Sequence, residues 1–407
     1  MSVLDDFTNE VIQSMQKDHT YRSLRHMTTP ETSRIQLAGT SGEPSQELML
    51  LASNSYLDLA NIPELKKAMA DAVLKWGTGS GGARLTTGNK TPHLALEEEI
   101  AKFKGEEAAI TFGTGYMANV GTISALCARK DIIFSDELNH ASIIDGIRLS
   151  RAKCYVYKHN DLEDLRSKIA EAVNVNGQKL GENAAEKVRG VIVTDAVFSM
   201  DGDLANLPEL LKIAKDHSLL LMIDEAHATG VVGRTGRGLA EYFGCEHADV
   251  TVGTLSKAIA CEGGFVAGKK QLIEFLKNKA RSFIFTTAMV PAVAFAACNN
   301  LRYLENHPEC VQKLQSNVEF FCKALQKAGL QVPSVPSAIV PIIVGDEEKA
   351  LLVSAELQKQ GILISAIRYP TVQKGSARLR ASLMASLSTE DLEFAAQKIA
   401  QTIQKMR

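Results

Sequence analysis

Lys257 stands in an unusual sequence context, "TVGTLSKAIACEGGFVAG", residues 251–268. An apolar, strand-like run leads to Thr254 and Ser256, and a pair of glycines after the lysine permits close approach of a bulky group. A lysine amine reacts with a carbonyl only when it is neutral, so burial or a nearby charge must lower its pKa. A lysine at the end of a strand is more often structural, so this segment alone leaves both interpretations open.

Asp224 and His227 lie in "LLLMIDEAHATG", residues 219–230, where the aspartate ends an apolar run. A carboxylate in that position is costly unless a cation pairs with it. The protonated pyridine nitrogen of pyridoxal 5'-phosphate (PLP) is such a cation. An aspartate that caps a helix or binds magnesium remains an alternative for this motif. A helicase is excluded, because the sequence has no GxxxxGK[ST] loop to accompany "DEAH".

Two further motifs could contact an anionic aromatic ligand. The glycine-rich "TFGTGYMAN", residues 111–119, is typical of a turn into a helix, whose free N–H groups favour phosphate. His140, in the polar segment "SDELNHASIIDG", could stack on a ring. Glycine-rich turns are common and a single histidine is more often structural, so each motif is weak by itself.

The composition excludes several classes of function. The 407 residues carry a net charge of −2 and are 45% hydrophobic, without a basic stripe, so we expect neither nucleic acid nor membrane partners. The N-terminus is acidic and lacks an apolar run, which predicts a cytoplasmic protein without a targeting peptide. The seven cysteines form no CxxC pair, so we expect reduced thiols and no metal site.

Short apolar runs alternate with helical patterns over most of the chain, which predicts an α/β fold. The central sheet should be mostly parallel with helices on both faces, and ligands should gather at the carboxyl ends of its strands. We expect an N-terminal helix and arm over residues 1–48, a large α/β domain over 49–290 and a smaller α+β domain over 291–407. One long helical tract is predicted over about 292–329.

Many motifs together, in this order, resemble the α-oxoamine synthases. The resemblance extends from Asn54 to the C-terminus. It rests on "SNSYLDLA", "GTGSGGARLTTGN", "HLALEEEIAKF", "GTGYMAN", "DELNHASIIDGIRLS", "HND", "VFSMDGD", "IDEAHATGVVGRTGRG" and "TLSKAIACEGGFVAG". It implies a fold-type I PLP-dependent transferase that condenses an amino acid with an acyl thioester and releases carbon dioxide.

The resemblance also implies a role for individual residues. Lys257 would hold PLP and move the substrate α-proton, and Asp224 would pair with the pyridine nitrogen. His227 would bind the phenolic oxygen and His140 would stack on the ring. The other cofactor residues would be Gly115, Tyr116 and Thr254 at the phosphate, Ser199 near the phenolic oxygen, and Thr286 and Thr287 at the phosphate of a neighbouring subunit in a homodimer. The substrate would meet Arg22, Asn54, Arg368, Thr371 and Arg380.

The segment "AIRYPTVQKGSARLR", residues 366–380, is most similar to family members that act in biotin synthesis. Those members condense L-alanine with pimeloyl-CoA or pimeloyl-ACP, giving 8-amino-7-oxononanoate. Alternatives are acetyl transfer to glycine, the use of longer acyl chains, and an idle PLP-binding regulator. Asp195, Ala260 and Tyr369 stand where the family usually has glutamate, glycine and proline, so the acyl preference stays open. Only the resemblance separates alanine from glycine or serine as the amino acid.

Overall fold

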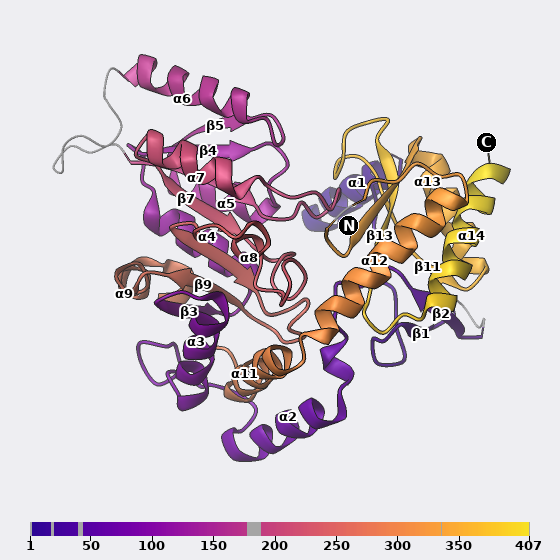
Figure 1. Ribbon diagram of the computed structural model, residues 1–407, viewed down its shortest axis with the longest axis horizontal. Coiled ribbons are helices and arrows are strands. Elements are labelled where there is room, and N and C mark those ends of the chain that lie inside the picture. Colours follow the sequence, from indigo (N-terminus) through magenta and orange to yellow (C-terminus); the bar gives the residue numbers. More distant parts are fainter. Residues whose placement is uncertain (1, 18–19, 40–43, 177–188, 335, 407) are drawn as a thin grey trace.

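The computed structural model describes residues 2–17, 20–39, 44–176, 189–334 and 336–406, so the expected N-terminal segment 1–48 is described only in part. Figure 1 shows a large sheet with its helices on one side of the molecule and two small sheets with α13 and α14 on the other. The long helix α12 runs between the two parts. None of the helices among the described residues is long and apolar enough to cross a membrane.

The elements follow one another along the chain as helices and strands in frequent alternation. The helices are α1 Val3–Lys17, the 3-10 helix η1 Leu59–Asn61, α2 Pro63–Trp76, α3 Thr91–Lys104, α4 Gly115–Leu126, α5 Ala141–Ser150, α6 Leu162–Asn176, α7 Leu207–Asp216, α8 Leu239–Phe243, α9 Lys270–Lys279, α10 Arg281–Ile284, α11 Pro291–Asn306, α12 Glu309–Lys327, α13 Glu347–Lys359 and α14 Thr389–Lys405. The strands are β1 Arg34–Leu37, β2 Gln46–Leu50, β3 Ala108–Phe112, β4 Ile132–Asp136, β5 Lys153–Tyr157, β6 Gly190–Asp195, β7 Leu220–Asp224, β8 Val250–Thr254, β9 Gly264–Gly268, β10 Ile339–Gly345, β11 Ile362–Leu363, β12 Ser365–Ile367 and β13 Ala377–Ser382.

The large sheet has seven strands in the order β3-β9-β8-β7-β6-β4-β5. Strand β9 runs antiparallel to both of its neighbours, and the other pairs are parallel. The central strands are buried along their whole length, as expected of a parallel sheet with helices on both faces. The predicted α/β fold with a mostly parallel sheet is therefore confirmed. The parallel strands bring Asp136, Asp195, Asp224 and Thr254 to one edge.

The smaller part is built on two three-stranded sheets, β1-β2-β11 and β10-β13-β12. Because β2 pairs with β11, strands from the start and the end of the chain share one sheet. The helical tract expected over 292–329 is present as two helices, since α11 and α12 are separated at His307 and Pro308. Proline cannot donate to the preceding turn and disfavours a helical residue before it, so one helix ends and another begins.

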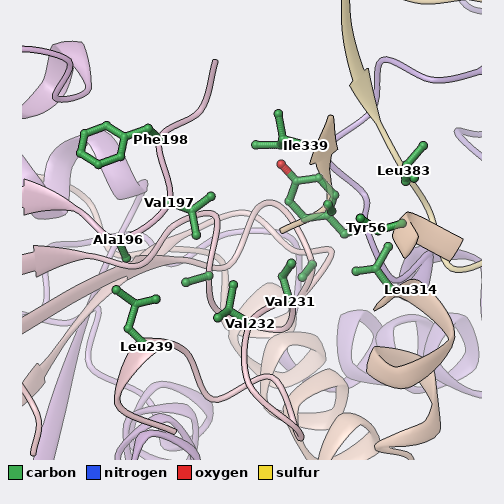
Figure 2. Close-up of a cluster of buried hydrophobic side chains, with 14 of the residues drawn as sticks. Tyr56, Ala196, Val197, Phe198, Val231, Val232, Leu239, Leu314, Ile339 and Leu383 are labelled. Carbon is green, nitrogen blue, oxygen red and sulfur yellow. The ribbon is translucent and has the colours of Figure 1, made fainter. Parts of the chain in front are cut away.

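A continuous hydrophobic core joins the two parts. Tyr56, Val231, Leu314, Ile339 and Leu383 come from distant segments and are buried in one cluster (Figure 2). Burying an aliphatic side chain of this size contributes about 1.5–3 kcal/mol. This packing sets the position of the small sheets relative to the strand ends of the large one.

Candidate active site

Lys257 lies in a tight turn that directly follows β8. The Thr254 hydroxyl donates to the Gly263 carbonyl at 2.9 Å and accepts from the Ser256 amide at 3.2 Å, which fixes the turn. The Lys257 Nζ lies 2.8 Å from Nε2 of His227. Burial lowers the pKa of Lys257 to about 8, against the opposing effect of the Asp224 charge. A minor fraction of this amine is therefore neutral near physiological pH, far more than for an ordinary lysine, as nucleophilic chemistry requires.

His227 continues a chain of hydrogen bonds that starts at Lys257. Its Nδ1 lies 2.7 Å from the Tyr56 hydroxyl, which also donates to Asn54 Oδ1 at 3.1 Å. Burial lowers the pKa of His227, with the Lys257 and Arg380 charges acting in the same direction. Burial raises the pKa of Tyr56, although Arg380 opposes the shift. Both groups are consequently neutral hydrogen-bonding partners near pH 7.

Arg380, on β13, connects the small domain to this chain of hydrogen bonds. Its guanidinium donates to Asn54 Oδ1 at 3.2 Å, to Ser382 Oγ at 2.6 Å and to the Ser199 carbonyl. Arg380 is buried. The structure thus gathers four of the predicted residues, Lys257, Asn54, Ser199 and Arg380, around His227. A planar guanidinium at this point suits a carboxylate ligand.

Asp224 ends β7 as a buried carboxylate, 5% exposed. Its oxygens accept from Asn119 Nδ2 at 2.6 Å and from the Ala226 amide at 2.8 Å. Among the described residues, no lysine, arginine or histidine forms an ion pair with it. A carboxylate buried without a cationic partner is expensive, which favours a ligand that carries a positive charge.

His140 and Asp195 lie beside Asp224. The His140 amide donates to Asp195 Oδ2 at 2.8 Å, and its Nδ1 lies 2.7 Å from Ser142 Oγ. Burial lowers the pKa of His140, although Asp224 opposes the shift. Asp195 pairs with Asp224 in the sheet register, and burial together with the Asp224 charge raises the pKa of Asp195 well above its usual range. The Asp195 carboxyl therefore contacts the backbone amide of His140.

The N-terminus of α4 provides an anion-binding feature next to the lysine turn. Thr114 caps the helix by accepting from the Met117 amide at 3.1 Å. A Cβ placed on Gly115 would lie only 3.1 Å from Cβ of Thr254, so glycine lets the two segments meet. Tyr116 is 46% exposed and its hydroxyl donates to Asp145. Free N–H groups at this helix end, beside a threonine hydroxyl, suit a phosphate.

These features fit PLP. The amine with a pKa of about 8 suits the aldehyde, the unpaired buried carboxylate suits the pyridine nitrogen, and the helix N-terminus suits the phosphate. The Asn119 Oδ1 atom is also buried without a hydrogen-bond partner in the part of the chain that the structure describes. A polar group left unpaired in a site is a feature that a ligand can satisfy.

Some predicted residues lie elsewhere in the protein. Thr286 and Thr287 line a small pocket together with the buried Arg84. Arg22 is exposed between α1 and β1. Thr371 is exposed in the turn between β12 and β13, and its amide donates to the carbonyl of the half-buried Arg368 at 2.9 Å. The roles of these residues still rest on the resemblance alone.

Two buried residues of the site were not among those predicted, Tyr56 and Asn119. Both lie inside motifs that supported the resemblance, "SNSYLDLA" and "GTGYMAN". The available signal was an amide or a phenol in a motif rich in small residues. It did not indicate the partners, because Tyr56 and His227 are 171 residues apart.

Comparisons with known proteins identify the relatives of this chain. A profile described as "Aminotransferase class I and II" matches residues 46–399. The chain is 44% identical to 8-amino-7-oxononanoate synthase from Lysinibacillus sphaericus over 396 residues, which is 97% of each chain. It resembles the structure of 8-amino-7-oxononanoate synthase from Francisella tularensis with a TM-score of 0.74 and 31% identity, over 88% of this chain and 98% of that chain. It also resembles serine palmitoyltransferase from S. paucimobilis, solved with PLP and myriocin, with a TM-score of 0.88 and 27% identity, over 100% and 99% of the two chains.

Proposed function

Since the chain belongs to the aminotransferase class I and II family and, within it, to the α-oxoamine synthases, we propose that it condenses L-alanine with a pimeloyl thioester. The products are 8-amino-7-oxononanoate, carbon dioxide and the free thiol. The protein is a PLP-dependent acyltransferase. The observation that carries the proposal is the 44% identity to a synthase of this name over 97% of the chain.

The residues of the site can perform the proton and charge steps that this reaction needs. PLP, when bound, supplies an electron sink for the α-carbon of the amino acid. Asp224 stabilises positive charge at the ring nitrogen, and Lys257 accepts the α-proton as a neutral amine and later returns a proton. His227 holds the Lys257 Nζ at 2.8 Å and is itself held by Tyr56.

Arg380 is placed to orient the amino acid. Its contacts with Asn54 and with the Ser199 carbonyl fix the plane of the guanidinium close to His227. We infer that it binds the substrate carboxylate and releases it as carbon dioxide forms. Arg22, Arg368 and Thr371 are proposed substrate contacts, as the resemblance implies.

Serine palmitoyl transfer is the alternative with specific support, because the structural similarity to that enzyme is high. A TM-score compares backbones. Family members that use different acyl substrates share the same backbone fold, so the score does not distinguish them. Sequence identity is higher to the synthases, at 44% to the L. sphaericus synthase and 31% to the F. tularensis synthase against 27% to the palmitoyltransferase. The identity therefore favours the pimeloyl substrate.

We further propose a cytoplasmic homodimer in which Thr286 and Thr287 serve the partner's site. Co-expression of a Lys257→Ala chain with a Thr286→Ala/Thr287→Ala chain tests this arrangement. One site of the mixed dimer then has every residue intact, so activity should exceed that of either variant alone. A mixed dimer with no more activity than the two parents contradicts the shared site.

Mass spectrometry of the product from the PLP form tests the reaction. Three mixtures are compared, namely pimeloyl-CoA or pimeloyl-ACP with L-alanine, acetyl-CoA with glycine, and palmitoyl-CoA with L-serine. The mass of 8-amino-7-oxononanoate from the first mixture alone supports the proposal. A product only from the second or third mixture reassigns the substrate, and no product from any mixture favours the idle PLP-binding protein.

A further inference from the structure

The segment Val197–Leu204, called here the 197–204 loop, lies between the large sheet and the small domain. It is closed on itself, since the Phe198 amide donates to the Asp203 carbonyl at 3.1 Å and the Gly202 amide donates to the Phe198 carbonyl at 2.8 Å. Val197 and Leu204 pair as an antiparallel bridge. These contacts make the loop a compact unit.

On one side, the 197–204 loop contacts the small domain through three of its residues. The Ser199 carbonyl accepts from Arg380, and Asp201 forms an ion pair with Arg378. The Gly202 carbonyl accepts from Ser337 Oγ at 2.8 Å. The position of this loop thus determines where Arg380 finds one of its three partners.

On the other side, two adjacent residues that follow β5 hold the loop to the large sheet. His159 Nδ1 lies 3.1 Å from Asp136 Oδ1, and His159 Nε2 lies 2.9 Å from Asp203 Oδ2. Asn160 donates to Asp136 Oδ2 through its amide at 2.9 Å and to Asp203 Oδ2 through its side chain at 2.6 Å. Asp136, at the end of β4, and Asp203, in the loop, are therefore bridged twice.

The His159 ring is charged in this arrangement. Each of its nitrogens faces a carboxylate oxygen, which only accepts, so both nitrogens must carry a proton. Burial alone would lower the pKa of His159, but hydrogen bonds to Asp136 and Asp203 outweigh it and raise the pKa to about 10. Phe198 packs edge-on against the ring, with the centroids 4.3 Å apart. The charged His159 ring thus lies between two carboxylates and packs against Phe198 of the 197–204 loop.

We propose that His159 is a positioning residue that acts through Asp203 and the 197–204 loop to hold Arg380 where it binds the amino acid carboxylate. This inference rests on the role of Arg380 in the proposed function. Without the imidazolium, Asp136 and Asp203 face each other as like charges with only Asn160 between them, so the loop is held less firmly to the large sheet. The Ser199 carbonyl then fixes Arg380 less firmly relative to the large sheet, while Lys257, His227 and Asp224 keep their contacts.

The test is the affinity of the PLP form for amino acids without any acyl donor, measured from the change in its absorption spectrum. L-Alanine, glycine and L-serine are titrated into the wild type, His159→Gln and the double variant His159→Gln/Asp203→Asn. We expect the Kd of the preferred amino acid to rise about tenfold in His159→Gln. The double variant should recover most of the affinity, because two neutral amides can hydrogen-bond without repulsion.

Steady-state kinetics separate positioning from general damage to the fold. In His159→Gln the KM for the amino acid should rise about tenfold, while kcat at saturating amino acid changes less than about twofold. His307→Gln is the matched control, because His307 also lies 2.8 Å from a carboxylate, that of Glu309, but on the surface at the end of α11. It should leave both constants unchanged.

An unchanged amino acid Kd in folded His159→Gln overturns the inference, as does a fall in kcat with no change in KM. If His159→Gln does not fold, Asp203→Asn alone decides, since it keeps the His159–Asp136 contact but weakens the hold on the loop. An unchanged Kd in that variant also overturns it. A wild type that binds none of the three amino acids instead refutes the proposed function, so the two failures are distinct.

Discussion

The amine of Lys257 lies 2.8 Å from Nε2 of His227, and burial lowers the pKa of both residues. Burial disfavours a positive charge on either group. The neutral imidazole holds the Lys257 amine in place, while Tyr56 and Asn54 fix the imidazole on its other side.

Lys257→Ala should abolish turnover, with a loss on the order of 10³-fold or more, because we propose that Lys257 both holds PLP and acts as the base. Borohydride reduction of the PLP form followed by mass spectrometry should attach PLP covalently to the wild type and not to the variant. Lys269→Ala, at an exposed lysine before α9, is the control and should keep full activity. Turnover at wild-type rates in Lys257→Ala would refute the assigned role.

The uptake of PLP by the cofactor-free protein should depend on the Lys257 amine. Its pKa is lowered to about 8, so the amine is cationic below that pH and neutral above it. The rate of PLP uptake, followed by absorbance in rapid mixing, should rise with pH, pass through an inflection near pH 8 and level off at higher pH. Asp224→Asn should move this inflection to lower pH, since Asp224 favours the cationic amine. An inflection near 10.5, the usual lysine value, contradicts the buried environment.

Tyr56→Phe should lower kcat by about tenfold, because it removes the hydroxyl that lies 2.7 Å from His227 Nδ1 and leaves a buried ring nitrogen unpaired. The matched control is Tyr155→Phe. The Tyr155 hydroxyl is also buried but has no hydrogen-bond partner within the described ranges. Kinetics with saturating substrates should separate the two variants. Equal effects of both would show that the Tyr56 hydroxyl has no special role.

Arg380→Lys should raise the KM for the amino acid by at least about tenfold, because an ammonium cannot replace a planar donor that reaches Asn54, Ser382 and Ser199 at once. Arg34→Lys is the control, since Arg34 pairs with Asp391 on the exposed face of the small domain. Initial rates at varied amino acid concentration measure the effect. A change confined to the KM of the acyl thioester would move Arg380 to the other substrate.

The strand-end residues could be predicted from the sequence. Asp224, Thr254 and Lys257 each follow an apolar run, and the carboxyl ends of parallel strands share one edge of a sheet. Arg380 could be placed near them only through the resemblance, and Tyr56 could not be placed at all. Their meeting with His227 depends on how the small sheets pack on the large one, which no local pattern encodes.

Local signals also failed where one residue overrides a longer pattern. The helical periodicity over 292–329 is real, but Pro308 divides it into α11 and α12. The contact that His159 makes near the site could not be predicted from local patterns either. "HND" and "VFSMDGD" were visible as motifs, yet the contact between His159 and Asp203 spans 44 residues and follows only from the neighbouring positions of the chain after β5 and the 197–204 loop.

The stability that His159 contributes should depend on pH with a definite sign. Its pKa is raised from 6.5 to about 10 in the folded protein, by Asp136 and Asp203 acting against burial. Glu137 is a third acid nearby, since its carboxylate accepts from the His159 amide at 2.9 Å. Below about pH 6.5 the ring is protonated in both the folded and the unfolded chain, so the stabilisation is fully present. Above that pH the unfolded chain loses the proton first, and the stabilisation declines until pH 10.

Urea unfolding of the wild type and His159→Gln at several pH values between 6 and 10 measures this contribution. The difference in the free energy of unfolding should be largest near pH 6 and should shrink steadily toward pH 10. Comparing the two proteins at each pH cancels the titration of groups that they share. A difference that is flat or that grows with pH would mean that the ring is neutral in the fold, and the bridge between Asp136 and Asp203 would then lack the charge on which it depends.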